Sequence, residues 1–455
     1  MKAANSPPAS EWKLPGSCEK KSPWTIHARG LYTVVVSETR KQVDPPLIDT
    51  ATIPTLAVEP TRRDRVSAFA AGMAGWTLDA FDFFLVVFCL TDIGATFHQS
   101  DAAVTGALLA TLALRPVGAF LFGAMADRYG RRPALILNLL LFAVATLATA
   151  AAPSFRVFLL IRGFFGIVMG GQWGIGASLA MEKVPVRLRG VLSGLLQQGY
   201  SIGNLLAAVA TYFFAKSGSW RLIFSLASIP ALLAAALCYF FVQESDVWKR
   251  TKHNSFGDIG KAFYAHKWLF VYMALFMMAM NMSSHGTQDL YPTFLQRKWG
   301  VGVHMRSVFT GITTMGAVIG GIFVGFISDR IGRRKAMTFA IGGAMLTIPL
   351  WAFAPTLPLL ILGGFIMQFM VQGAWGVVPA HLAEMAPDSL RGSLPGLGYQ
   401  CGVLLAASTP SIQSNLAKHF GYPHTMAGTM VVILCIAAAM TMIGKEKKAA
   451  EFGKV

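Results

Sequence analysis

The sequence predicts an all-α integral membrane protein, with twelve transmembrane helices in two pseudo-symmetric bundles of six. Three observations lead to this prediction. The 455-residue chain is 54% hydrophobic and only 13% charged, with a mean hydropathy of +0.53, which is outside the usual balance of a soluble protein. Its apolar segments reach the length of about 20 residues that crosses a bilayer as a helix. Its second half also repeats its first.

Taken in order, the chain begins with a polar, proline-bearing stretch that has no sustained apolar period and no signal-peptide pattern, so we expect a disordered cytoplasmic tail. The apolar segments follow at 68–94, 102–125, 133–151, 156–181, 189–214, 220–242, 268–293, 306–328, 335–354, 357–381, 392–416 and 424–444. The predicted domains are therefore the tail (1–65), an N-terminal bundle (66–242), a cytoplasmic linker (243–267), a C-terminal bundle (268–444) and a second cytoplasmic tail (445–455).

The basic residues predict how the helices are oriented. Most of the 39 Lys and Arg lie in the tails and in the loops on one side of the predicted helices, and few lie on the other side. Because positive loops stay in the cytoplasm, both termini are predicted to be cytoplasmic in the inner or plasma membrane. The same placement excludes nucleic acid as the reason for the net charge of +17, since no aromatic and basic face appears.

The most informative stretch is a polar stripe, NMSSHGTQDLYPT at 281–293, which continues an apolar segment. Asn281, His285 and Asp289 are spaced by four residues, so they share one face of a helix, and Gln288 is one step from that line. Such groups inside a membrane helix usually face a cavity and mark a substrate or proton path. Headgroup contact or hydrogen bonding between helices is the alternative explanation.

An internal repeat relates the two halves. The loop GAMADRYGRR at 123–132 matches GFISDRIGRR at 325–334, and the same offset of 202 aligns further residues of each half: Trp173 with Trp375, Glu182 with Glu384, Arg189 with Arg391 and Gln198 with Gln400. Parallel halves of this kind form transporters whose site lies at their interface. Because Asp79 plus the offset is Asn281, the acidic segment at 75–84 should face the polar stripe across one cavity.

These features resemble the major facilitator superfamily over residues 66–444. More narrowly, GWTLDAFDFF at 75–84 and LLQQGYSIGNLLA at 195–207 resemble the sialate/lactate proton-symporter family, and the polar stripe resembles lactate/pyruvate permeases at every fixed position. The resemblance implies a proton-coupled importer of short monocarboxylates. Its expected partners are a small carboxylate, protons and the lipid bilayer; no cofactor or metal is expected, and a monomer suffices.

Two arginines lie within apolar segments. A guanidinium presents a fork that matches a carboxylate. The lactate-permease resemblance implies that Arg115 is needed for transport, so we expect it to bind the substrate, unless it extends to the headgroups. Arg162, in the fourth apolar segment, is expected to pair with an acid of the first. Proton-coupled sugar porters of the superfamily use such a pair, an Asp in their first helix with an Arg in their fourth. Asp82 resembles that acid, and Asp79 is either a second acid or a packing residue.

These expectations define three sets of residues. The predicted substrate-binding residues are Arg115, Asn281, His285, Gln288 and Gln400. The predicted proton-coupling residues are Asp79, Asp82, Arg162, His285 and Asp289. The resemblance implies that the repeated loops latch the two halves together, and the predicted latch is Asp127, Arg128, Arg131, Arg132, Glu182, Arg189, Asp329, Arg330, Arg333, Arg334, Glu384 and Arg391.

Other functions share parts of this pattern. A symporter of sialic acid or another organic acid keeps the mechanism and changes the substrate. A drug/proton antiporter has the same loops, although the buried basic residues suit an anion better. A sensor that has lost transport would have nearly the same sequence. An enzyme is not expected, because the sequence has no nucleophile elbow, metal-binding His/Asp cluster or phosphate-binding glycine loop.

Overall fold

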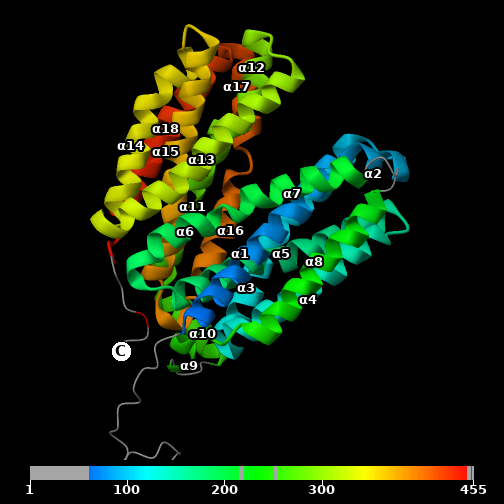
Figure 1. Cartoon of the computed structure of the whole chain (residues 1–455), viewed down its shortest axis with the longest axis vertical. Helices are drawn as coiled ribbons and strands as arrows, with labels where there is room; N and C mark the ends of the chain where they lie inside the picture. The colour runs from blue at the N-terminus through cyan, green and yellow to red at the C-terminus, as the bar shows by residue number, and fades with distance from the viewer. Residues whose placement is uncertain (1–60, 215–219, 251–254, 448–451, 453–455) are drawn as a thin grey trace, which may run out of the picture. The chain divides into compact units, whose positions relative to one another are not determined.

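A computed structural model describes residues 61–214, 220–250, 255–447 and 452, and every regular element in these ranges is helical (Figure 1). The N-terminal half contains α1 (Arg62–Phe88), α2 (Leu90–Phe97), α3 (Asp101–Tyr129), α4 (Arg131–Ala150), α5 (Phe155–Lys183), α6 (Arg189–Gln197), α7 (Gly199–Phe214) and α8 (Trp220–Phe241). The C-terminal half contains α11 (Lys267–Gln288), α12 (Tyr291–Trp299), α13 (Val303–Ile331), α14 (Arg333–Phe353), α15 (Leu357–Met385), α16 (Leu394–Ala406), α17 (Thr409–Phe420) and α18 (Tyr422–Ile443).

Some of the membrane spans are interrupted helices. In the described ranges, nine helices are long and apolar enough to cross a membrane. A tenth candidate span is bent: it consists of α10 (Phe256–Ala265) followed by the stretch Lys267–Trp299, which contains α11 and α12. The other two predicted spans are α6 with α7 and α16 with α17. Pro410 lies in the first turn of α17, where its missing N–H interrupts the helix. The arrangement is consistent with the predicted twelve-span fold.

The first helix begins earlier than the sequence predicts. Residues 1–60 lie outside the described part of the chain, but 61–65 were assigned to the disordered tail and are ordered. Thr61 caps α1: its hydroxyl accepts a hydrogen bond from the Asp64 N–H, and the Asp64 carboxylate accepts one from the Thr61 N–H. This reciprocal pair satisfies two backbone donors and fixes the helix start at Arg62.

The linker between the halves also contains helices, α9 (Asp246–Arg250) and α10. The two bundles meet at the end where α9 and α10 lie and diverge toward the opposite end (Figure 1). At the meeting end, α6 packs against α13 and α15, and α16 packs against α3 and α5. A Cβ atom on Gly194 would lie only 2.2 Å from the Gly321 carbonyl oxygen, so this crossing requires glycine.

Candidate functional site

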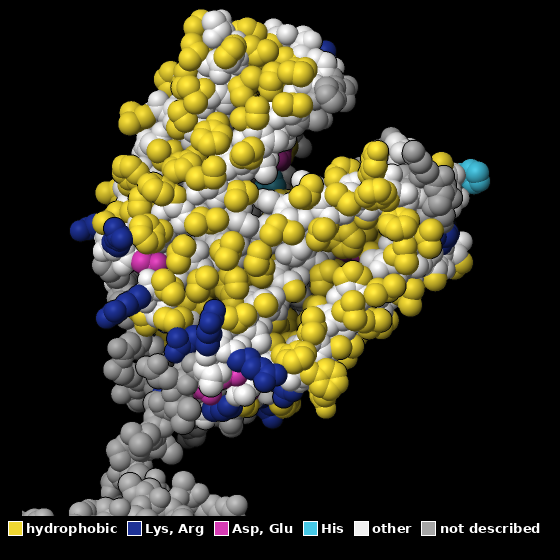
Figure 2. All heavy atoms as spheres, viewed as in Figure 1, with side chains coloured by type: hydrophobic (Ala, Val, Ile, Leu, Met, Phe, Trp, Pro, Cys, Tyr) yellow, Lys and Arg dark blue, Asp and Glu magenta, His cyan; other side chains and the backbone are white. Residues whose placement is uncertain are grey.

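A cavity of about 340 Å³ lies between the two bundles. Most of the residues that line it come from α1, α3 and α7 of one half and from α11, α13, α15 and α16 of the other, and α5, α6, α12, α14 and α17 also contribute. In Figure 2, Lys and Arg side chains gather at the end where the bundles meet, whereas a hollow opens between the bundles at the other end. The cavity is therefore closed on the basic side of the molecule and open on the opposite side.

The polar stripe of α11 lines this cavity, as its spacing predicts. Asn281, His285, Gln288 and Asp289 are all in its wall. The His285 Nδ1 atom lies 3.0 Å from the Asp289 Oδ2 atom, and the two side chains are 38% and 34% exposed. This carboxylate can fix the imidazole tautomer or share its proton, and both groups are open to water from the cavity.

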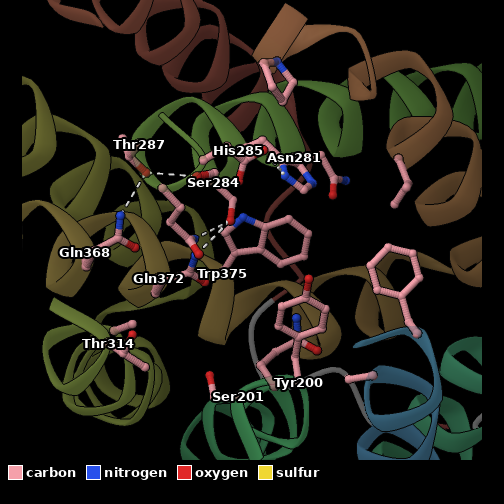
Figure 3. Close-up of a pocket in the computed structure, with 18 of the residues that line it drawn as sticks. Tyr200, Ser201, Asn281, Ser284, His285, Thr287, Thr314, Gln368, Gln372 and Trp375 are labelled. Atoms are coloured by element: carbon pink, nitrogen blue, oxygen red, sulfur yellow. Dashed lines mark hydrogen bonds and ion pairs between the residues drawn. The ribbon is translucent and has the colours of Figure 1, made fainter. Parts of the chain in front are cut away.

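Hydroxyl and amide groups cover the wall formed by α11 and α15 (Figure 3). The Ser284 hydroxyl accepts hydrogen bonds from the Gln288 and Gln372 amides, each at 2.8 Å. The Gln368 amide donates to the Thr287 hydroxyl at 3.1 Å. Gln368 and Gln372 were not predicted from the sequence, although two glutamines spaced by four residues in the apolar run FIMQFMVQGAW were a signal for a second polar face.

On the opposite wall, Arg115 of α3 pairs with Asp79 of α1. The Arg115 Nη2 atom lies 3.2 Å from the Asp79 Oδ2 atom, and the two side chains are 7% and 0% exposed. Both residues line the cavity, and Arg115 is the only Lys or Arg among the described residues that do so. The other Asp79 oxygen, Oδ1, is buried and has no hydrogen-bond partner in the part of the chain that the structure describes.

Asp82, one turn further along α1, pairs with Arg162 of α5, as the sequence analysis expects. The Arg162 Nη1 atom lies 2.6 Å from the Asp82 Oδ1 atom, and the Thr146 hydroxyl donates to Oδ2 at 2.8 Å. The Arg162 guanidinium also lies 4.1 Å from the centre of the Phe165 ring. Both charged side chains are fully buried, and neither is among the residues that line the cavity.

Aromatic rings make up much of the remaining wall. Trp76, Tyr200, Tyr399 and Trp375 line the cavity, and Tyr399 stacks on Trp173 with 4.5 Å between ring centroids. Gln400, a predicted substrate ligand, does not line the cavity. Its side chain is 1% exposed, and its amide points to the Gly170 carbonyl oxygen at 3.4 Å. At this level of α16, Tyr399 is the residue that faces the cavity.

The repeated loops join the two halves on the basic side, and we call this contact the gate. The Asp127 carboxylate accepts hydrogen bonds from the backbone N–H groups of Gly392 and Ser393, at 2.8 and 3.0 Å. The equivalent residue Asp329 accepts from the N–H groups of Gly190 and Val191, at 2.8 and 3.1 Å. Each acid therefore holds the start of the broken helix of the other half.

Arginine and glutamate side chains cross between the halves at the same level. Arg189 pairs with Glu384 at 3.1 Å, and Arg391 lies 3.8 Å from Glu182. All four residues belong to the predicted latch, and each arginine pairs with the glutamate of the other half. Within each half, the glutamate is also held by the arginine that begins the preceding helix, in the pairs Arg131–Glu182 at 3.2 Å and Arg333–Glu384 at 2.9 Å.

Four predicted latch arginines make contacts within their own half or with the linker. Arg128 stacks on Tyr129 and on Phe256 of α10, and Arg330 stacks on Phe326 of its own helix. Arg132 and Arg334 donate to backbone carbonyls at the ends of α8 and α18. Arg128 thereby attaches the linker to its loop, and Arg132 and Arg334 attach the neighbouring helices α8 and α18 to theirs.

Two glutamates that the sequence analysis missed support the gate. Glu244 accepts hydrogen bonds from the N–H groups of Arg131 and Arg132, at 3.0 and 3.1 Å. Glu446 accepts hydrogen bonds from the N–H groups of Arg333 and Arg334 at the start of α14, at 3.1 and 2.8 Å. The two acids differ by the repeat offset of 202, which was the available signal. Burial raises the pKa of Glu244, and the hydrogen bonds from the backbone oppose that rise.

Comparison with known protein families decides the assignment. The model of the family described as "Sugar (and other) transporter" matches residues 69–257 and 268–444. The chain belongs to this family. It is a transporter, not an enzyme, and the predicted major facilitator fold is confirmed. The two matched stretches correspond to the two halves and leave out part of the linker.

The relatives are transport proteins. The chain is 29% identical to a carboxylic acid transporter protein homolog of Saccharomyces cerevisiae over 80% of this chain, but it spans only 63% of that protein's length. It is 28% identical to the sialic acid transporter NanX of Escherichia coli, covering 83% of this chain and 92% of the relative. It is 27% identical to a cis,cis-muconate transport protein of Acinetobacter baylyi, over 77% of this chain and 87% of the relative.

Solved structures share the fold. The proton:xylose symporter XylE superposes with a TM-score of 0.69 at 19% identity, over 86% of this chain and 98% of that one. The human organic anion transporter MFSD10 superposes with a TM-score of 0.66 at 15% identity, over 82% and 99% of the two chains. The finer resemblance to the sialate/lactate family stays a prediction.

Proposed function

We propose that the chain is a secondary active transporter that carries a short monocarboxylate, such as lactate or pyruvate, together with protons by alternating access. The relatives support an acidic substrate, since their names describe carriers of a carboxylic acid, sialic acid and muconate. The polar stripe of α11 supports a short acid, because its pattern resembles that of lactate/pyruvate permeases.

The observation that carries the proposal is the Asp79–Arg115 pair in the cavity wall. An arginine buried in the membrane needs an anionic partner, and its planar fork accepts a carboxylate in two parallel hydrogen bonds. In this structure Asp79 supplies that carboxylate, at 3.2 Å. A substrate carboxylate in the same cavity has the same chemistry, so the substrate and Asp79 compete for one guanidinium.

This competition couples protons to the substrate. A proton from the open side adds to Asp79, whose Oδ1 atom has no partner among the described residues, and removes its negative charge. Arg115 then takes the substrate carboxylate as its new partner. After the cavity opens to the other side, Asp79 releases the proton, re-forms its bond to Arg115 and displaces the substrate. One anion and one proton cross together, so this step moves no net charge.

His285 and Asp289 offer a second place for a proton. They face Asp79 and Arg115 from the other half and are open to the cavity, so they can receive protons without a change in the gate. We assign the coupling proton first to Asp79, because only Asp79 shares a partner with the substrate. We infer that Asp82 and Arg162 hold α1 against α5, since their pair has no access to the cavity.

The gate gives the direction of access. Because the basic side is proposed to face the cytoplasm, the closed gate and the open cavity correspond to an outward-open state. We propose a location in the plasma membrane with both termini in the cytoplasm. One copy of the chain contains the whole cavity and both halves of the gate, so a monomer is sufficient for transport.

A second candidate is a symporter of sialic acid or another sugar acid. The specific observation in its favour is the wall of amides and hydroxyls on α11 and α15, within a cavity of about 340 Å³. A three-carbon acid would leave much of that wall to water, whereas a polyhydroxylated acid would bond to it. The carboxylate would still bind Arg115, so the coupling step is the same for both candidates.

The test is uptake of radiolabelled L-lactate into proteoliposomes under an imposed inward proton gradient, with unlabelled pyruvate, sialic acid and benzoate as competitors. We expect uptake that the gradient drives, that an uncoupler abolishes and that pyruvate blocks. Block by sialic acid alone, with transport of labelled sialic acid, would replace the first candidate by the second. No gradient-driven uptake of any of these acids would contradict the proposed function.

A further inference from the structure

A single aromatic residue of the C-terminal tail contacts the gate. Phe452 is partly buried, and the guanidinium carbons of Arg189 and Arg391 each lie 3.8 Å from the centre of its ring. The two arginines occupy equivalent positions of the repeat, because they differ by the offset of 202. The ring therefore contacts the same gate residue of both halves at once.

The surroundings of the ring explain why an aromatic residue suits this place. Arg189 and Arg391 reach the same centroid, so their charges are no further apart than about twice 3.8 Å. Each arginine also makes an ion pair across the halves, with Glu384 and Glu182 respectively. The face of an aromatic ring is electron-rich and attracts cations, so Phe452 offsets the repulsion between the two guanidinium groups.

We propose that Phe452 is an intramolecular wedge that stabilises the closed gate, and that the C-terminal tail thereby sets the balance between the two access states. The ring can hold both arginines only while the two halves meet on the basic side. Opening the gate separates Arg189 from Arg391, so at least one contact is lost. A contact made in one state only shifts the equilibrium toward that state.

This inference goes beyond the proposed function, because it concerns access and does not depend on the substrate. The substrate cavity lies on the other side of the gate, and Phe452 is not among the residues that line it. The tail would lower the population of the state that opens to the basic side while leaving the binding site unchanged. Loss of the tail contact would have the opposite effect.

The test measures access with single cysteines in a full-length variant whose five native cysteines are replaced by alanine. Ser193 is fully buried where the halves meet, and its hydroxyl accepts a hydrogen bond from the Ala380 N–H at 3.1 Å, so a cysteine there reacts only when the gate opens. Thr314 lines the open cavity, so a cysteine there reacts in the state described here. Labelling by a maleimide is followed in lipid nanodiscs without substrate.

We expect Phe452→Ala to raise the labelling rate of Ser193→Cys by about tenfold, and to slow the labelling of Thr314→Cys. Phe452→Leu, which keeps an apolar side chain without a ring face, should behave like Phe452→Ala. Phe452→Trp should label like the parent protein. The control is Phe256→Ala. It removes a ring on the same side of the molecule whose centre lies 4.6 Å from the Arg128 guanidinium and which is not stacked on Arg189 or Arg391. This variant should leave both labelling rates unchanged.

Three results would overturn the inference. Unchanged rates in Phe452→Ala would show that the ring does not stabilise the gate. Parent-like rates in Phe452→Leu would show that apolar packing is sufficient and that the arginine contacts contribute nothing. Equal effects of Phe452→Ala and Phe256→Ala would show a general effect of removing aromatic side chains from the basic side.

Discussion

Helix α1 carries two aspartate–arginine pairs one turn apart, and their surroundings differ. Asp82 and Arg162 are fully buried at 2.6 Å, and Thr146 donates a further hydrogen bond to the carboxylate. Asp79 and Arg115 are 3.2 Å apart in the cavity wall, and one Asp79 oxygen has no partner among the described residues. The first pair is closed to solvent and both oxygens of its carboxylate are bonded, whereas the second lines the cavity and has a carboxylate oxygen without a partner in the described part of the chain.

The difference shows that the residue types alone do not assign a role. Both pairs join an acid of α1 to an arginine of a neighbouring helix inside the membrane. Only access to the cavity lets a proton or a second carboxylate reach the pair. We therefore expect loss of Asp82 or Arg162 to affect stability, and loss of Asp79 or Arg115 to affect coupling and binding.

The largest expected effect is on the closed pair. Asp82→Asn leaves Arg162 as a buried charge without its counterion, which costs about 3–5 kcal/mol of stability. Asp79→Asn should cost less, because water in the cavity can solvate Arg115. The measurement is the thermal unfolding midpoint of both variants in the same detergent. Equal midpoints, together with loss of proton-driven accumulation in Asp82→Asn only, would reverse the two assignments.

The next effect separates the two arginines. Arg115→Lys keeps the charge but loses the bidentate fork, so the KM for the transported acid should rise by about 10- to 100-fold. Arg162→Lys should lower the amount of folded protein more than it changes KM. Uptake kinetics, normalised to the amount of folded protein, distinguish these outcomes. An unchanged KM in Arg115→Lys would remove Arg115 from the binding site.

A smaller effect concerns the third partner of the closed pair. Thr146→Val keeps the shape of the side chain and removes one hydrogen bond to the Asp82 carboxylate, at a cost of about 1.5–3 kcal/mol. We expect a lower unfolding midpoint, with an unchanged ratio of protons to substrate in reconstituted vesicles. A changed ratio would mean that the Asp82 site takes part in coupling after all.

The smallest expected effect extends the same contrast to two glutamines. Gln372 lines the cavity, so Gln372→Leu should weaken binding by about 5- to 10-fold if the substrate reaches its amide. Gln400 is outside the cavity, so Gln400→Leu should change KM by less than about twofold. Competition assays in the two variants measure both values. A larger loss in Gln400→Leu would return Gln400 to the set of substrate ligands.

The fold and the charged part of the cavity wall were predictable because membranes impose simple rules. A bilayer requires apolar helices of one length, and the offset of 202 relates the halves directly. Polar residues in those helices are rare, so Asp79, Arg115 and the α11 stripe stand out, and all of them line the cavity.

Other features depend on tertiary geometry that the sequence does not encode locally. The pairing of Arg189 with Glu384 follows from how the halves cross. Gln400 and Tyr399 are neighbours on α16, and only the rotation of that helix decides which of them faces the cavity. The early start of α1 depends on the Thr61–Asp64 capping box. This is a local signal, but it lies in a polar, basic stretch that resembles the rest of the predicted tail.

The most direct test of the competition between Asp79 and the substrate is the pH dependence of binding. The dissociation constant of L-lactate, or of sialic acid if lactate does not bind, would be measured calorimetrically for the wild-type chain and for Asp79→Asn over a range of pH. Because a proton on Asp79 frees Arg115, wild-type affinity should fall as the pH rises, by up to about tenfold per pH unit for one linked proton.

Asp79→Asn cannot lose that proton, so its affinity should not depend on pH over the same range. That result, with binding retained, would support the exchange of Asp79 for the substrate carboxylate at Arg115. An equal pH dependence in both proteins would contradict it, and would move the coupling proton to His285 and Asp289.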